Sequence, residues 1–132
     1  MQRSLVGSEM CIRDRSEDEM NLLMKEFGDN PFIGYWHDFG HIQRKHNLLI
    51  LNHEQFLRRM SSHLIGGHVN DVKWPARDHQ VPLLGGVVPF ERLLPFFPHG
   101  VPLVWELSSR VSSEDIRAAH KLWMEKFPQT LA

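Results

Sequence analysis

The sequence has few of the residues that covalent cross-links and membrane segments require. Its 132 residues include one cysteine, Cys11, so no disulfide can form within the chain. No apolar run reaches the roughly 18 residues that a membrane-spanning helix needs. The formal net charge of -1 predicts no nucleic-acid and no membrane partner. The composition is that of an ordinary globular domain, and the cytoplasm is its default location.

The first fifteen residues differ from the rest of the chain. Residues 1–15 lack the apolar core of a signal peptide and show no helix or strand pattern. The stretch LVGSEMCIRDR, from Leu5 to Arg15, closely resembles the translation of an adapter used in sequencing libraries. We therefore expect residues 1–15 to be an artefactual leader, with a natural disordered tail as the alternative. On this interpretation Cys11 belongs to the leader, and the natural reading frame is expected to continue upstream of Ser16.

Helix signals alternate with strand signals along residues 16–132. Capping residues followed by apolar residues at spacings of three and four predict helices, and short apolar runs predict strands. Helices are expected at 16–27, after Asp38, from Asn52, at 89–97 and from Ser112 to Phe127. Strands are expected at 31–37, 64–69 and 101–107. The segment 73–88, which is rich in proline and glycine, is expected to be a loop.

This alternation predicts an α/β fold with a parallel sheet. The strand at 101–107, VPLVWEL, is apolar and is expected to be buried on both faces. Three strands make a poor closed domain, because an open parallel sheet of this size leaves its edges and one face uncovered. The sequence therefore favours a part of a larger α/β domain.

Residues that suit metal binding accompany each expected strand. Asp38 and His41 follow the first strand, His68 lies near the end of the second, and Glu106 lies in the third. In α/β barrels, residues at the carboxyl ends of the strands form the active site. Carboxylates and imidazoles together suit a divalent ion such as Mn²⁺, Mg²⁺, Co²⁺ or Zn²⁺. Glu106 is the firmest candidate, because an unpaired acidic residue inside an apolar strand would be costly to bury.

Each candidate also has a purely structural interpretation. Asp38 could cap a helix, His41 could simply begin that helix, and His68 could be a packed core histidine. Asn70, Asp71, Asp78 and His79 could be turn or loop residues. The other histidines, at 37, 46, 53, 63, 99 and 120, are expected to be surface or packing residues. Trp36, Trp74 and Trp105 suit either a sugar pocket or the core.

The motifs together resemble those of the xylose isomerase-like barrels, which comprise sugar-phosphate isomerases, ketose epimerases and apurinic endonucleases. The resemblance runs from about Ser16 to Phe127 and implies a partial TIM (β/α)₈ barrel, about its last three βα units. The matching features are Asp-x-x-His at Asp38 and His41, His-x-Asn-Asp from His68 to Asp71, Asp78-His79 followed by Pro82 and Gly85, and the strand-borne Glu106.

This resemblance implies a metal site and a reaction. Asp38, His68 and Glu106 would be ligands of one divalent metal, with Glu106 also serving as an acid/base group. His41 and His79 would bind the substrate, although in the endonucleases of the family His41 would be a further metal ligand. The metal would polarise a sugar or sugar phosphate so that an enediolate forms during isomerisation or epimerisation. The implied partner is that small molecule, and self-association into a homo-oligomer is an open alternative.

Two other functions remain open from the sequence. An apurinic endonuclease would need Asp-x-His and Gly-Glu-Gly patterns, whereas Asp78 and His79 are adjacent and the following loop reads Pro-Leu-Leu-Gly-Gly. The chain also shows no Arg/Lys cluster for phosphates. The other alternative is a non-catalytic barrel fragment. The family's fourth ligand, a glutamate on an earlier strand, has no counterpart here. We therefore expect residues 16–132 alone to bind metal weakly and to lack isomerase activity.

Overall fold

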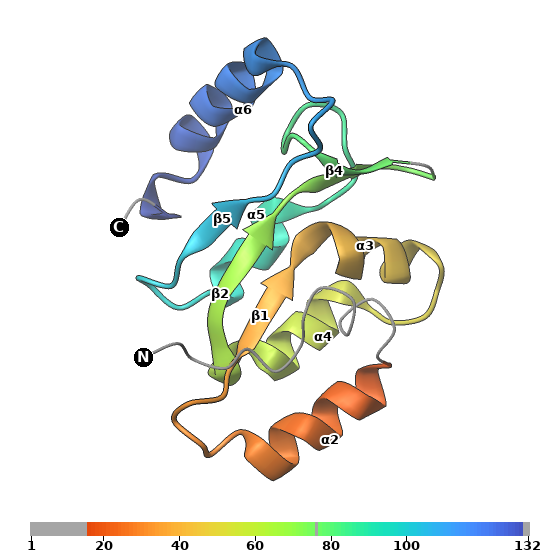
Figure 1. Ribbon diagram of the computed structural model, residues 1–132, viewed down its shortest axis with the longest axis vertical. Coiled ribbons are helices and arrows are strands. Elements are labelled where there is room, and N and C mark those ends of the chain that lie inside the picture. The colour runs from red at the N-terminus through yellow and green to blue at the C-terminus, as the bar shows by residue number, and fades with distance from the viewer. Residues whose placement is uncertain (1–15, 76, 131–132) are drawn as a thin grey trace.

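The computed structural model describes residues 16–75 and 77–130 (Figure 1). The helices are α2 (Glu17–Phe27), α3 (Phe39–Asn47), α4 (His53–Met60), α5 (Phe90–Leu93) and α6 (Ser113–Lys126). The strands are β1 (Tyr35–Asp38), β2 (Leu64–Val69), β3 (Asp71–Lys73), β4 (Arg77–Gln80) and β5 (Leu103–Trp105). No helix within these described ranges is long and apolar enough to cross a membrane. The expectation for residues 1–15 lies outside the described residues.

Strands β1, β2 and β5 form a parallel sheet with β2 in the middle. The Cα atoms of Asp38 and Val104 lie opposite that of His68, one on each side. The predicted α/β class with three parallel strands is confirmed. Strand β2 has the expected bounds, whereas β1 and β5 are shorter than the expected strands at 31–37 and 101–107.

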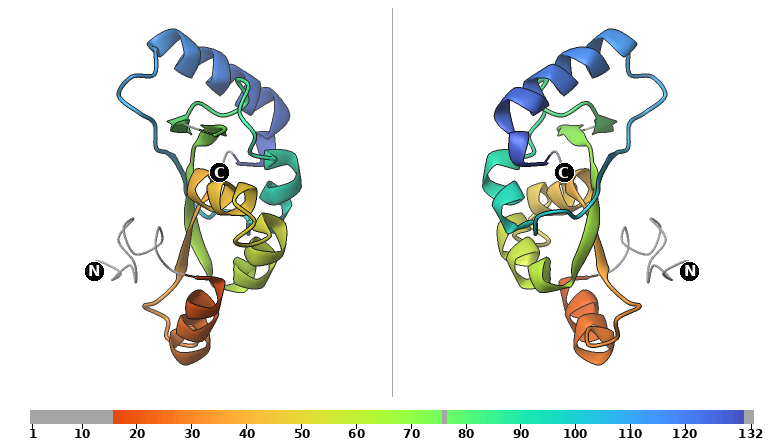
Figure 2. Two further views of the ribbon diagram at one scale, coloured as in Figure 1. Left: turned by 90° about the vertical axis from the view of Figure 1, so that its right-hand side faces the viewer. Right: turned by 90° about the vertical axis from the view of Figure 1, so that its left-hand side faces the viewer.

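The helices cover one face of this sheet. Figure 2 shows α3, α4 and α5 on the same side. Side chains alternate across a strand, so the fully buried His37 and Val69 point to that covered face. Trp36, His68 and Val104 occupy the other face, where Val104 is 47% exposed. The expectation that the last strand is buried on both faces is therefore wrong, because no described element covers this side of β5.

The predicted helix starts are correct. Ser16, Asn52 and Ser112 cap α2, α4 and α6, and each side-chain oxygen accepts a hydrogen bond from the backbone N–H three residues later. Helix α6 joins the core through the buried Trp123, whose ring centroid lies 5.2 Å from that of Phe90. These caps fix where the three helices begin, and the Trp123 contact fixes α6 on the core.

The prediction that 73–88 is a simple loop is wrong, because part of this segment forms a hairpin. Strands β3 and β4 pair antiparallel, with Asp71 opposite Gln80. The buried Asp71 carboxylate accepts hydrogen bonds from the backbone N–H groups of Leu83 and Val88, at 3.3 and 3.0 Å. Asp71 therefore anchors the following loop, and the hairpin brings β4 next to α3.

Candidate metal site

Asp38 ends β1 and caps the N-terminus of α3. Its Oδ1 accepts hydrogen bonds from the His41 backbone N–H at 2.9 Å and from Asn70 Nδ2 at 3.2 Å. Its Oδ2 faces two imidazoles, with His41 Nδ1 at 3.2 Å and His68 Nδ1 at 3.7 Å. The helix-cap interpretation is therefore correct for one oxygen, and the other oxygen points into a cluster of polar side chains.

The Asp38 carboxyl is nearly inaccessible to solvent, with the residue only 1% exposed. Burial alone raises its pKa, but the hydrogen bond to His68, the positive charge of His41 and the two hydrogen bonds to Oδ1 outweigh it. The pKa of Asp38 is therefore lower than its ordinary value of 3.8. The side chain is a carboxylate at neutral pH, which is the form that binds a metal ion.

Glu106 follows β5 directly, and its backbone N–H donates to the Val69 carbonyl at 3.1 Å, which continues the parallel ladder. Its Oε2 lies 3.2 Å from His68 Nδ1. One donor atom from each of Asp38, His68 and Glu106 lies within 4.8 Å of the others. Donors about 2.1 Å from one ion lie roughly 3 to 4.2 Å apart. The 3.2 and 3.7 Å separations that His68 makes within the group fit this range.

The group opens on the uncovered face of the sheet. The side chains of His68 and Glu106 are 26% and 29% exposed, so a small ligand can approach them. The Trp36 ring packs edge-on against His68, with the centroids 5.4 Å apart. Trp105 instead packs against Trp123 at 5.8 Å, on the covered side. Of the two, Trp36 is the tryptophan placed to contact a ligand of the group.

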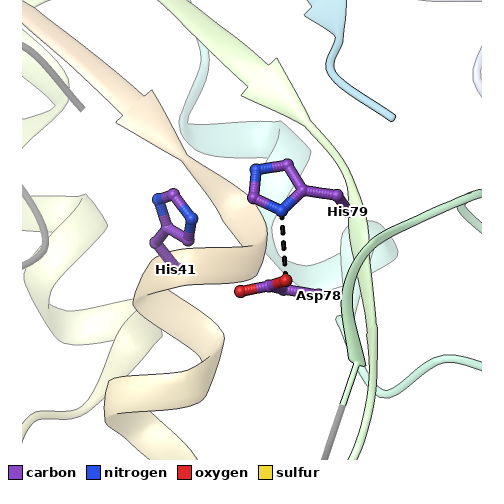
Figure 3. A group of neighbouring side chains, drawn as sticks. All are labelled: His41, Asp78 and His79. Atoms are coloured by element: carbon purple, nitrogen blue, oxygen red, sulfur yellow. Dashed lines mark ion pairs between the residues drawn. The ribbon is translucent and has the colours of Figure 1, made fainter. Parts of the chain in front are cut away.

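A second group lies beside the first (Figure 3). His41 from α3 and Asp78 and His79 from β4 also offer donor atoms within 4.8 Å of one another. His79 Nδ1 lies 3.1 Å from Asp78 Oδ1, and Asp78 Oδ2 forms an ion pair with Arg44. A neutral His79 that donates from Nδ1 presents its Nε2 lone pair 3.6 Å from Glu106 Oε2. A lone pair and a carboxylate oxygen at this distance favour a proton or a metal ion between them.

Asp78 and the backbone hold His79 in this orientation. Burial raises the pKa of Asp78, but hydrogen bonds from His79 and Arg44 outweigh it, so the pKa is lower than usual and the group is ionised. The backbone of His79 lies in the left-handed region, with φ 53°. That conformation costs a non-glycine residue about 1–2 kcal/mol. The Ser108 backbone N–H, which donates to the His79 carbonyl at 2.8 Å, helps to offset this cost.

A buried hydrogen-bond chain lies behind the site. His37 and His53 were expected to be surface or packing residues; both are buried, and their Nε2 atoms lie 2.9 Å apart. Gln43 Nε2 donates to Asn47, so Gln43 Oε1 accepts from His53 Nδ1 at 2.7 Å. His37 must then donate from Nε2 and accept the Tyr35 hydroxyl proton at Nδ1, 3.1 Å away. Both rings are neutral in this arrangement, which ties β1 to α3 and α4.

Asn70 positions the Asp38 carboxylate, although its sequence context suits a turn residue equally well. It is fully buried, and its amide holds Asp38 Oδ1. Gly40 makes room for it, since a Cβ at Gly40 would lie 1.8 Å from Asn70 Oδ1. The available signal was that this asparagine directly follows the strand that carries His68. The sequence alone did not distinguish it from a turn residue.

The structure brings the five residues predicted for the site into one region. Asp38, His68 and Glu106 form one group, and His41 and His79 form the neighbouring group with Asp78. Their assignment as metal ligands, acid/base group and substrate-binding residues stays a prediction. Comparison with models of known protein families and with curated proteins finds no match for this chain.

Proposed function

We propose that these residues form the metal site of an isomerase or epimerase of a sugar or sugar phosphate. The observation that carries the proposal is the convergence of Asp38, His68 and Glu106 at the carboxyl ends of three adjacent parallel strands. Strand ends of this kind form the active sites of α/β barrels. The mixture of carboxylates and an imidazole suits Mn²⁺, Mg²⁺, Co²⁺ or Zn²⁺.

The residues suit proton transfer next to a carbonyl group. A bound divalent ion would polarise the carbonyl and the adjacent hydroxyl of an open-chain sugar. Glu106, partly exposed at the edge of the group, would take the proton from the neighbouring carbon and return it. His79, held at Nδ1 by Asp78, would accept a hydrogen bond from a substrate hydroxyl at Nε2. His41 would hold a further hydroxyl, while Asp38 stays ionised.

The one-sided packing of the sheet supports the wider fold that we propose, a partial (β/α)₈ barrel. Such a barrel carries its helices outside and its active-site residues inside, at the top. Here the helices cover one face of the sheet (Figure 2). The strand register places Trp36, His68 and Val104 on the other face. The uncovered face would be the inside of the barrel, which accounts for the exposure of Val104.

A metal-dependent endonuclease acting at abasic DNA is the second candidate. The group of His41, Asp78 and His79 favours it, because neighbouring ligand groups can hold more than one ion. Asp78 is, however, already paired with Arg44 and His79, which suits an orienting role better than that of a ligand. We therefore rank the isomerase first. The third possibility is a fragment without catalysis of its own.

The reaction is tested in D₂O, with Mn²⁺ or Co²⁺ and a sugar or sugar phosphate. After the metal has been removed, NMR of the sugar measures how much solvent deuterium it has incorporated. We expect no incorporation with the 132-residue chain alone. We expect incorporation beside the carbonyl when residues 16–132 form part of a complete (β/α)₈ barrel. Glu106→Gln should abolish it in that protein, whereas His99→Gln, at an exposed histidine of the 97–102 connection, should not. A complete barrel that incorporates no deuterium would contradict the proposal.

A further inference from the structure

A cavity of about 440 Å³ lies next to the candidate site and shares Asp78 with its second group. Its lining residues come from the β3–β4 hairpin, from the connection between β5 and α6 and from the first turn of α6. Figure 1 shows where these elements lie. The cavity volume falls within the range of about 300–1,000 Å³ that small-molecule sites occupy. The residues that decide its chemistry are Lys73, Arg77, Asp78, Ser108, Arg110 and Asp115.

The charges around this cavity favour an anion. Lys73, Arg77 and Arg110 are exposed, and none of them forms an ion pair with another residue in the part of the chain that the structure describes. Asp78 is already neutralised by its ion pair with Arg44, and its Oδ1 lies 3.1 Å from His79 Nδ1. Three cations therefore face one further carboxylate, Asp115, at the start of α6. This excess contrasts with the slightly acidic chain as a whole.

Two side chains lie between the cavity and the metal site. Asp78 lines the cavity and holds His79 Nδ1 at 3.1 Å, and His79 Nε2 lies 3.6 Å from Glu106 Oε2 on the other side. Ser108, which also lines the cavity, donates its backbone N–H to the His79 carbonyl at 2.8 Å. A ligand long enough to extend past these two side chains from the cavity would reach the proposed metal ligands.

We propose that this cavity binds the phosphate group of the substrate, so that the site acts on a sugar phosphate and not on a neutral sugar. That the phosphate belongs to a substrate rests on the proposed function, whereas the anion site itself does not. A phosphate carries close to two negative charges and three acceptor oxygens, and arginine guanidinium groups bind it through paired N–H donors. Arg77 and Arg110, from opposite walls, supply those donors, and Lys73 adds a third positive charge.

The test is a titration of the metal-free chain with inorganic phosphate, in chloride buffer with EDTA, followed by NMR of the backbone amides. We expect saturable shifts in the hairpin and in 107–111. The double variant Arg77→Gln, Arg110→Gln should bind phosphate at least tenfold more weakly. Lys121→Gln, which removes an exposed cation of α6 outside the cavity, should change the affinity less than twofold. Circular dichroism of both variants checks that they fold.

Control variants and competing ligands distinguish the possible outcomes. Absence of saturable phosphate binding, or equal weakening by Lys121→Gln, overturns the phosphate site. Acetate binding as tightly as phosphate overturns it in favour of a sugar acid. A short single-stranded oligonucleotide that binds more tightly, with a steep loss in salt, overturns it in favour of nucleic acid. His68→Gln should weaken Co²⁺ binding and leave phosphate binding intact. Phosphate binding without any Co²⁺ binding supports the cavity and contradicts the proposed metal site.

Discussion

The buried pair His37 and His53 predicts that the metal-free protein loses stability in mildly acidic solution. Burial lowers the pKa of His37 from 6.5 to about 3, although the neighbouring Asp38 carboxylate acts in the opposite direction. Burial also lowers the pKa of His53 well below 6.5, and the charges of His37 and His46 add to this. The hydrogen-bond chain requires both rings to be neutral, so the geometry and the pKa directions agree.

The sign and size of the effect follow from proton linkage. Below pH 6.5 the unfolded chain binds a proton at His37 and the folded chain does not, so the free energy of unfolding falls as the pH falls. The contribution of His37 is complete above pH 6.5 and is lost progressively down to about pH 3. With about 1.36 kcal/mol per pKa unit, His37 alone removes about 2 kcal/mol at pH 5. His53 acts in the same direction.

Urea denaturation followed by circular dichroism measures this effect between pH 7.5 and 5, with EDTA present. This window lies above the range in which Asp38 titrates. We expect the free energy of unfolding to fall by about 2 kcal/mol or more. His53→Gln should be less stable overall but should show a weaker pH dependence, because one of the two buried histidines is then absent. A pH dependence that is unchanged in His53→Gln would refute the reasoning.

Three further predictions concern single side chains. Asp71→Asn should lower the free energy of unfolding by about 1–3 kcal/mol in urea denaturation, because an amide N–H₂ would face the Leu83 N–H that one carboxylate oxygen now accepts; an unchanged midpoint would contradict the anchoring role. Gly40→Ala should destabilise by about 1–3 kcal/mol although alanine favours helices, because its Cβ would clash with Asn70; stabilisation would show that the close approach is wrong. Asp38→Asn should keep the α3 cap and change the free energy of unfolding by less than about 1 kcal/mol, while weakening Co²⁺ binding at least tenfold. A large loss of stability with unchanged Co²⁺ binding would assign Asp38 to the cap alone.

Local signals in the sequence were enough to predict the helix starts and the central strand. A side-chain cap such as Ser112 acts within three residues, and the apolar, glycine-containing run of β2 needs no distant partner to be recognised. The expected positions of Asp38, His68 and Glu106 at strand ends led to a correct prediction that they lie together. The common direction of parallel strands is what makes this inference possible.

Features that depend on distant contacts were not predicted. The β3–β4 hairpin is short, and its loop is held by hydrogen bonds from 81–88 to Asp71, which no local pattern reveals. The linked pair His37 and His53 joins residues sixteen positions apart. The apolar neighbours of Val104 led to the prediction that it is buried. Its exposure depends instead on which face of the sheet the helices cover. Long-range packing decided each of these cases.

The most direct measurement for the central claim is a Co²⁺ titration of the chain followed by its visible absorption spectrum. We expect one saturable site with bands typical of nitrogen and oxygen ligands and without a thiolate charge-transfer band. His68→Gln and Glu106→Gln should each weaken binding at least tenfold, and His99→Gln should not. Weak binding by the wild-type chain is expected, since three protein ligands leave coordination positions open. No saturable binding, or equal binding by all three variants, would contradict a metal site formed by Asp38, His68 and Glu106.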